Sequence, residues 1–529
     1  MKQRIYIDVN SGIGRMNSRE ERIPYTVDAL LEEMKYYRVH ASIVYSNIAR
    51  DYSFVKGNAE LLEQISASKR LFGVATVLPD VRYELQEGMD YLEKIISSGI
   101  KAFKLYPNSM NHGLDPFYLG DLAGFMMDKK VPLLIDLQET NWKDLKEVLK
   151  VFPTLNMILC NTSWDTNRYL FPLMSKYKNL HFDISSNQAN DILKTCKKHF
   201  GTDRALFGTS YPNKVMGGLK AMVEYSGLTD DDKNNISYKN AVRLFNLPEI
   251  EAYSEQECML DEIALKMDIG KPLDNELVID AHTHLVDTNH YTVSYVPIIN
   301  GDEDNLIKKM DVLGIDKMFI CPWEGLCTDG KSANETSLRA KEKYSDRIEV
   351  YAMCNPLYKE DLDTVVEKFH KIHGFKGLKP YYCFNNYDIL GEKYDEWFDY
   401  GNRNRLIMLV HTGLPGIAEK VEKLSEKYKD MSFLMAHSGA SYKTVRENIK
   451  VVKNRDNVFL EITYTTLTNG IIEYMVEEVG ADKVIFGTDM PMRDPAPQLA
   501  WVCYAKISLE DKRKILGGNI KKLLEKCIN

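Results

Sequence analysis

Features that mark secreted or membrane proteins are absent from this sequence. No run of eighteen apolar residues is present, so the sequence predicts no transmembrane helix. The first residues, MKQRIYIDVNSG, lack the apolar core and cleavage site of a secretory signal and lead directly into a predicted strand. The nine cysteines include no CxxC pair, and this odd number is typical of free thiols in a reducing compartment. We therefore expect a cytoplasmic protein.

An excess of positive charge is also missing. Lys and Arg number 68 against 76 Asp and Glu, which gives a net charge of −8. This balance argues against nucleic acid or an anionic membrane as the main partner. With 44% hydrophobic and 27% charged residues, the composition is that of a soluble globular protein, and 529 residues exceed one ordinary domain. We expect several domains and a small-molecule substrate.

The second half of the chain alternates short apolar runs with amphipathic segments such as AEKVEKLSEKYKDM at 418–431. Such alternation predicts parallel strands joined by helical crossovers, and the continuous apolar character of each run favours strands buried on both faces. Eight such units in about 250 residues predict a closed (β/α)8 TIM barrel. The strand runs are 277–284, 316–323, 347–356, 375–382, 406–413, 432–439, 457–464 and 483–491.

The first half repeats this pattern, with strand runs at 4–10, 41–47, 71–79, 100–108, 131–138, 156–163, 180–187 and 205–212. Landmarks recur at a nearly constant offset: ALFGTSYP matches VIFGTDMP, and the aligned pairs are Lys104 with Lys379, Asn58 with Asn334, and Asn240 with Asn519. We predict a tandem duplication of two TIM barrels, at 1–250 and 275–529, joined by a segment near 249–274 that forms one helix. Two unrelated α/β domains are the opposing interpretation.

Residues suited to metal binding gather at the predicted strand ends of the second half. His282 and His284 end the first strand, His411 the fifth, His437 the sixth and Asp489 the eighth. A single histidine at a strand end is more often a satisfied polar residue than a ligand. In a TIM barrel, however, these strand ends meet at one mouth, so their coincidence indicates a metal site.

The landmarks IDAHTH, GLKP, LVHTG, MAHSG and IFGTDMP resemble the amidohydrolase superfamily, in the branch that includes aminocarboxymuconate-semialdehyde decarboxylase. The resemblance covers nearly all of 275–529 and, more weakly, 1–250. It implies one divalent metal per chain, zinc in the first place and manganese in the second, bound by His282, His284, His411 and Asp489. It also implies that His437 acts as an acid/base on water, with Asp489 as a further proton acceptor.

A site of this kind supports more than one reaction. Zinc lowers the pKa of a bound water to about 7, and histidine, with its ordinary pKa near 6.5, shuttles protons. We predict metal-dependent hydrolysis of an amide, ester or lactone bond in a small molecule. Nonoxidative decarboxylation of an aromatic or unsaturated carboxylic acid is the alternative within the enzymes. A non-catalytic, metal-stabilised binding or scaffold protein is a third interpretation, which the presence of His437 disfavours.

Further residues of the second half are placed at the same mouth. The substrate-contact candidates are Lys379, which ends the fourth strand, and Glu324, Tyr381, Tyr464 and Arg493, on predicted loops that follow strands. Each is also explained by loop packing or by solvation. Lys379 raises the alternative of two metals bridged by a carboxylated lysine. Because Lys104 persists where the ligands are lost, we favour one metal.

Two histidines of the second half lie away from this mouth. His370 and His373 precede the fourth strand on a predicted helix. That position is the opposite end of the barrel from the one where active sites form. We expect both to be surface residues.

In the first half the alignment replaces all five metal-site residues. In chain order, the replacements are Asn10, Gly12, Asp136, Asn161 and Ser210. Asparagine, glycine and serine are poor zinc ligands. Asp8 and Asp136 could bind a hard cation, but two carboxylates are too few ligands for a typical site. We predict that this barrel lacks metal chemistry and supports the second as an intra-chain pseudo-dimer, with homo-oligomers left open. The competing view is that it binds a ligand near Asp136 and His112.

Overall fold

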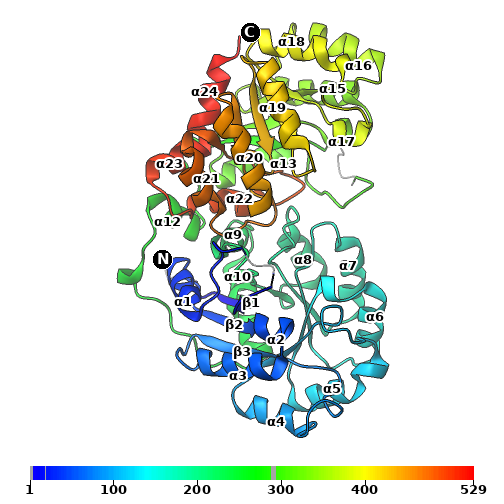
Figure 1. Ribbon diagram of the computed structural model, residues 1–529, viewed down its shortest axis with the longest axis vertical. Coiled ribbons are helices and arrows are strands. Elements are labelled where there is room, and N and C mark those ends of the chain that lie inside the picture. Colours follow the sequence, from blue (N-terminus) through cyan, green and yellow to red (C-terminus); the bar gives the residue numbers. More distant parts are fainter. Residues whose placement is uncertain (1–3, 18–19, 287–292, 529) are drawn as a thin grey trace. The chain divides into compact units, whose positions relative to one another are not determined.

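The structure is a computed structural model that describes residues 4–17, 20–286 and 293–528. The chain divides into two compact units, Met1–Leu260 and Asp261–Asn529. In Figure 1 the first unit runs from blue to green and the second from green to red. None of the helices in the described ranges has the length and apolar character that a membrane crossing requires.

The first unit is a parallel sheet of eight strands in sequential order, with helices between the strands. The strands are β1 (Ile7–Ile13), β2 (Ala41–Ser46), β3 (Leu71–Thr76), β4 (Ala102–Leu105), β5 (Leu133–Asp136), β6 (Met157–Cys160), β7 (Leu180–Asp183) and β8 (Ala205–Leu206). The α-helices are α1 (Val27–Tyr36), α2 (Asn47–Asp51), α3 (Phe54–Ile65), α4 (Asp90–Ser97), α5 (Pro116–Lys129), α6 (Trp142–Val151), α7 (Asn167–Lys176), α8 (Ile192–Phe200), α9 (Met216–Glu224), α10 (Asp230–Asn234) and α11 (Asn240–Phe245).

Strand β1 also contacts the segment that follows β8, and this contact closes the first barrel. The backbone N–H of Val9 donates to the Phe207 carbonyl at 3.0 Å, and Ser11 pairs with Tyr211. The buried Asp8 carboxylate accepts hydrogen bonds from the backbone N–H and the hydroxyl of Thr209. The seam is therefore held by a side-chain clamp as well as by backbone pairing.

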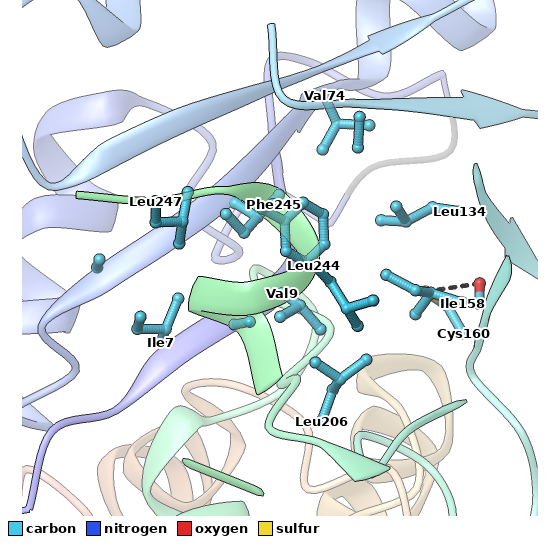
Figure 2. Close-up of a cluster of buried hydrophobic side chains, with 14 residues drawn as sticks. Ile7, Val9, Val74, Leu134, Ile158, Cys160, Leu206, Leu244, Phe245 and Leu247 are labelled. Atoms are coloured by element: carbon cyan, nitrogen blue, oxygen red, sulfur yellow. Dashed lines mark hydrogen bonds between the residues drawn. The ribbon is translucent and has the colours of Figure 1, made fainter. Parts of the chain in front are cut away.

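Figure 2 shows the apolar core of the first barrel, where α11 packs against the sheet. Leu244 and Phe245 of the helix meet side chains from nearly every strand: Ile7, Val9, Ala41, Ile43, Val74, Ala102, Leu134, Ile158, Cys160 and Leu206. Burial of each large aliphatic or aromatic side chain contributes about 1.5–3 kcal/mol. At the start of α11, Asn240 donates to the carbonyls of Thr202 and Ala205, which anchors the helix.

The second unit has the same architecture. Its strands are β9 (Ile279–Thr283), β10 (Lys317–Ile320), β11 (Ile348–Met353), β12 (Gly377–Lys379), β13 (Ile407–His411), β14 (Ser432–Ala436), β15 (Val458–Glu461) and β16 (Val484–Ile485). Its α-helices are α12 (Glu262–Asp268), α13 (Glu303–Leu313), α14 (Trp323–Cys327), α15 (Gly330–Lys343), α16 (Lys359–Thr364), α17 (Tyr382–Asn385), α18 (Asp395–Arg403), α19 (Ile417–Lys427), α20 (Tyr442–Asn454), α21 (Ile471–Val479), α22 (Pro495–Cys503), α23 (Leu509–Arg513) and α24 (Asn519–Lys526).

The landmarks that recur in the sequence make the same bonds in both units. Asn58 of α3 exchanges two hydrogen bonds with the backbone of Thr76, and Asn334 of α15 does the same with Met353. Asn519 donates to two backbone carbonyls beside β16, as Asn240 does beside β8. Each asparagine ties a helix to a strand. The prediction of two tandem TIM barrels is confirmed.

The connector forms less helix than the sequence suggested. It contains a short 3-10 turn, Glu255–Glu257, and the two-turn α12, which packs against α22. Asp261 caps α12 by accepting from the backbone N–H of Ala264 at 2.9 Å, and this fixes where the helix begins. The polar first half of the segment offers no apolar face that would extend the helix toward residue 249.

His370 is buried, so the prediction of a surface residue was wrong. Its Nδ1 donates to the Phe375 carbonyl at 2.6 Å, and its Nε2 accepts the indole N–H of Trp397 at 2.8 Å. A neutral imidazole makes both bonds at once, and burial lowers the pKa of His370 to about 4. The sequence places this residue at the correct end of the barrel, but it does not show that α18 covers its helix face.

His40, at the base of the first barrel, makes stability depend on pH. The side chain is fully buried, and its Nδ1 accepts the backbone N–H of Tyr6 at 3.1 Å. Burial, followed by the charges of Lys220 and Arg70, lowers the pKa of His40 to about 2. In the unfolded chain the imidazole titrates near 6.5, so below that pH the unfolded state binds the extra proton. Folded-state stability is therefore lost as the pH falls from about 6.5, at up to about 1.4 kcal/mol per pH unit.

We expect His40→Asn, which keeps a side-chain acceptor but does not titrate, to flatten the pH dependence of the unfolding free energy. Chemical denaturation of the full chain between about pH 6.5 and 4.5 measures this slope. His199→Asn, at an exposed position of the same barrel, is the matched control and should leave the slope unchanged. A His40 variant with the wild-type slope would show that this imidazole is not the acid-sensitive group.

Candidate metal centre

Strand β9 presents two imidazoles on the same side, because residues two apart share a face. The Nδ1 atom of His282 lies 3.0 Å from Oε2 of Glu461, and Nδ1 of His284 lies 3.0 Å from the Cys321 carbonyl oxygen. The Cys321 carbonyl only accepts, and both Glu461 oxygens accept backbone N–H groups, so each imidazole donates its Nδ1 proton. Their Nε2 atoms therefore remain as free electron-pair donors.

Asp489 brings a carboxylate to these two Nε2 atoms. Its Oδ1 lies 3.0 Å from Nε2 of His284 and 3.5 Å from Nε2 of His282. All three side chains are buried. Burial lowers the pKa of His282 well below its usual value, so this imidazole stays neutral and supplies no proton to the cluster.

This donor set fits a divalent cation. Two imidazole nitrogens and one carboxylate oxygen converge, and each imidazole is oriented by a hydrogen bond at its other nitrogen, as metal-binding histidines usually are. The described residues offer one further group of this kind, His282 with His437 and Glu461. Imidazole and carboxylate together suit zinc or manganese better than a soft ion that requires thiolates.

His437 follows β14 and stands beside the cluster, with its ring centroid 5.0 Å from that of His282. Its Nδ1 lies 2.9 Å from the Thr463 carbonyl oxygen, so this proton is donated there and Nε2 is unprotonated. Burial lowers the pKa of His437 well below its usual value. The side chain is therefore a proton acceptor held in one tautomer.

His411 ends β13 next to His437, with ring centroids 4.7 Å apart. Burial lowers its pKa to about 3. Among the described residues, neither cation-binding group includes a His411 atom. The structure thus brings His282, His284 and Asp489 together directly, whereas His411 lies beside His437 and outside this group.

The remaining substrate-contact candidates lie in three different places. Arg493 forms an ion pair with Asp489 and a hydrogen bond with Thr465, and its guanidinium lies 5.6 Å from the centre of the Tyr464 ring. Lys379 and Tyr381 line a small cavity, described below. Glu324 has an exposed side chain in α14 and is not among the residues that line this cavity.

The backbone at two of these positions is unusual. His437 and Asp489 have φ angles of +64° and +67°, in the left-handed region that residues with a Cβ rarely adopt. Such conformations cost of order 1–3 kcal/mol and cluster at functional sites. The equivalent Asn161 and Ser210 keep φ angles of +54° and +59°, so the first barrel retains the backbone of the site.

Comparison with known proteins identifies the family of the chain. The sequence profile of the family described as Amidohydrolase matches residues 26–247 and 279–526, one segment in each barrel. The chain belongs to the amidohydrolase family. A search of curated proteins finds no match.

Solved structures similar to this chain each align with about half of it. An uncharacterised TIM-barrel protein from Bordetella bronchiseptica is 18% identical, with 47% of this chain and 98% of that chain covered and a TM-score of 0.38. A putative amidohydrolase from Staphylococcus aureus is 15% identical, with 47% and 99% covered and a TM-score of 0.37. A 5-carboxyvanillate decarboxylase from Novosphingobium aromaticivorans, solved with manganese, is 15% identical, with 48% and 97% covered and a TM-score of 0.40.

The first barrel fills the same positions with a hydrogen-bond network. Asn10 donates to Asp183 at 2.8 Å and to Ser210 at 3.2 Å, and Asn161 donates to Asp136 at 2.8 Å. In the second barrel, His282 and His437 present unprotonated Nε2 atoms at these positions. In the first barrel, the side-chain amides of Asn10 and Asn161 present N–H donors instead. Protein N–H groups of this network thus donate to the carboxylates of Asp136 and Asp183.

A tyrosine also occupies the space of one lost ligand. Gly12 stands at the position of His284, and it is paired across the strands with Tyr45. A Cβ added at Gly12 would lie 2.9 Å from Cε2 of Tyr45, which is too close for a real contact. In the second barrel Cys321 takes the place of Tyr45 and leaves room for the imidazole of His284.

His112 lies away from this network. It lines a pocket of about 560 Å³ between the loops that follow β2, β3 and β4, together with Arg50, Tyr52 and Tyr118. Its Nδ1 lies 3.0 Å from the Gly113 carbonyl oxygen, so that bond fixes the tautomer. Asp136 is not among the residues that line this pocket, so the structure separates the two residues that the sequence suggested as one ligand site.

Glu461 is the site residue that the sequence prediction missed. Its carboxylate accepts from His282, from the backbone N–H of His437 and from Thr463, and burial raises its pKa to about 7. The sequence does contain a sign of this residue. Glu461 is a carboxylate at the end of the apolar run VFLE, and Asp183 stands at the equivalent position of the first barrel.

We expect Glu461→Gln to weaken metal affinity by about 10–100-fold, because the amide no longer favours the required tautomer of His282. Titration of the purified chain with zinc or manganese, followed by metal analysis, measures the change; wild type should hold about one equivalent. Glu477→Gln, at an exposed position in α21, is the control. Equal affinity in wild type and Glu461→Gln would remove Glu461 from the metal centre.

Proposed function

We propose that the second barrel is a metal-dependent hydrolase that cleaves an amide, ester or lactone bond of a small molecule. The observation that carries this proposal is His437, a buried imidazole with unprotonated Nε2 beside the cluster of His282, His284 and Asp489. A binding or scaffold protein needs the ligands but has no use for an adjacent proton acceptor.

The residues of the chain have separate tasks in this proposal. His282, His284 and Asp489, with His411 as a fourth ligand, would hold one zinc or manganese ion, which supplies Lewis acidity. His437 accepts a proton from the attacking water at Nε2, while the Thr463 carbonyl fixes its other nitrogen. Arg493 lies against Asp489, and Tyr464 lies against Arg493, so both are placed to contact substrate.

Decarboxylation of an aromatic or unsaturated acid is the second candidate, and the buried cation Lys379 near the site favours it. A decarboxylase must deliver a proton to carbon, whereas His437 is held as an acceptor. This difference makes hydrolysis the first choice.

The test is a substrate screen on the full chain loaded with zinc or manganese. Amides, esters and lactones are assayed for hydrolysis, and a panel of aromatic and unsaturated carboxylates is assayed for CO2 release. We expect hydrolysis without CO2. Evolution of CO2 would replace hydrolase by decarboxylase, and a metal-loaded protein inactive in both screens would favour the binding role.

A further inference from the structure

Lys379 is a buried lysine whose Nζ lies 5.7 Å from the centre of the Tyr381 ring. It is the last residue of β12 and is 1% exposed, and among the described residues its Nζ has no hydrogen-bond acceptor. Burial lowers its pKa from the usual value. Removing an ammonium from water costs several kcal/mol unless a partner compensates. The partner is therefore to be sought outside the barrel's own side chains.

The first barrel shows what a satisfied lysine looks like at the same position. Lys104 is also fully buried, but its Nζ lies 3.0 Å from the Asp136 carboxylate and 3.9 Å from the centre of the Tyr45 ring. The chain itself supplies an anion and an aromatic face. The ion pair with Asp136 therefore explains why Lys104 can be buried, and this explanation does not apply to Lys379.

Both partners of Lys104 are replaced in the second barrel. His411 stands where Asp136 stands, and Cys321 where Tyr45 stands. Neither a neutral imidazole nor a thiol neutralises an ammonium. The nearby carboxylate, Glu461, uses its oxygens for His282, His437 and Thr463.

The space next to Lys379 is suited to a small anionic group. A cavity of about 40 Å³ is lined by Lys379, Tyr381, Thr328 and Asn355, together with Cys327 and Cys354. A single water needs about 10–15 Å³ of such cavity volume, so this space takes a group the size of a carboxylate. The Tyr381 ring lies 5.5 Å from the ring of His411, which in turn adjoins His437.

We propose that Lys379 is the counter-ion of a substrate carboxylate, so that the substrate of the second barrel is a carboxylic acid. Its charged group occupies the cavity of Lys379 and Tyr381, and its reacting bond lies toward His437. This inference rests on the proposed function for the position of the reacting bond, but the carboxylate site is tested separately. Burial raises the pKa of Tyr381, so its hydroxyl stays protonated beside Lys379.

The test uses metal-loaded full chain and two probes of nearly equal shape, benzoate and benzamide, with calorimetry as the binding readout. We expect wild type to bind benzoate in preference to benzamide. Lys379→Met should weaken benzoate binding by about 10–100-fold and leave benzamide binding unchanged, because a charge-assisted hydrogen bond is lost. Metal content is measured on both proteins, since benzoate also has affinity for metals.

Several outcomes separate this inference from the proposed hydrolysis. Lys379-dependent benzoate binding in a protein that turns over no ester, amide or lactone would retain the carboxylate site and reject the hydrolase. Hydrolysis of neutral substrates with an unchanged kcat/KM in Lys379→Met, together with equal benzoate binding, would reject the carboxylate site alone. A second metal equivalent that disappears with Lys379→Met would assign the lysine to metal binding and overturn the inference.

Discussion

Replacing His437 with asparagine is expected to lower the turnover of metal-loaded enzyme by about 10²–10⁴-fold, the usual contribution of a general acid or base. Asparagine is the residue that the first barrel carries at this position, and it tolerates the left-handed φ of +64°. The fold should therefore survive, while the proton acceptor at Nε2 is lost. Steady-state kinetics across pH measure the effect, and the limb of the profile that reports His437 should vanish.

Two controls make the His437→Asn result interpretable. Metal analysis must show the wild-type content, because His437 also adjoins His282. His373→Asn changes a partly exposed histidine of the same barrel and should leave turnover unchanged. Wild-type turnover in His437→Asn would remove this residue from the reaction and with it the main support for hydrolysis.

Replacing the buried lysine by methionine is expected to have opposite effects on the stability of the two barrels. Lys104→Met should destabilise the first barrel by about 3–5 kcal/mol, because it leaves Asp136 largely buried without its cation. Lys379→Met should leave the stability of the second barrel unchanged or increase it. There the substitution replaces an uncompensated buried charge by an apolar side chain of similar length.

Chemical unfolding of the full chain, followed by hydrogen exchange at amides of β4 and β12, reports the two barrels separately. Lys104→Met combined with Asp136→Asn should recover part of the loss, since the double change removes both charges. A destabilisation by Lys379→Met as large as that by Lys104→Met would mean that Lys379 has a structural partner. A stable Lys104→Met would mean that its ion pair with Asp136 contributes little.

The barrels and the converging ligands were predictable because the relevant information is periodic and local. Apolar runs buried on both faces identify parallel strands, and strand order alone determines which ends meet at the mouth. His282, His284 and Asp489 could therefore be grouped although some 200 residues separate the first two from the third. Strand lengths were less accurate: β16 has two residues, since beyond Ile485 the backbone departs from regular pairing.

The groups that orient the ligands were not predictable in the same way. Glu461 appears in the sequence as one polar residue in a strand, and only the closed barrel turns it toward His282. The acceptor for His284 is the backbone carbonyl of Cys321, which no side-chain pattern reveals. The burial of His370 beneath α18 likewise depends on packing between elements distant in sequence.

The Tyr45 ring beside Gly12 has an evolutionary consequence. A mutation that restores histidine at position 12 places its Cβ 2.9 Å from that ring, so the first step back toward a ligand set is penalised before any metal is bound. Changing Tyr45 first removes the aromatic face that lies 3.9 Å from Lys104. Whether Gly12 or Tyr45 is substituted first, the first substitution is therefore destabilising. As long as Tyr45 keeps its place, a ligand side chain at position 12 requires this pair of strands to repack.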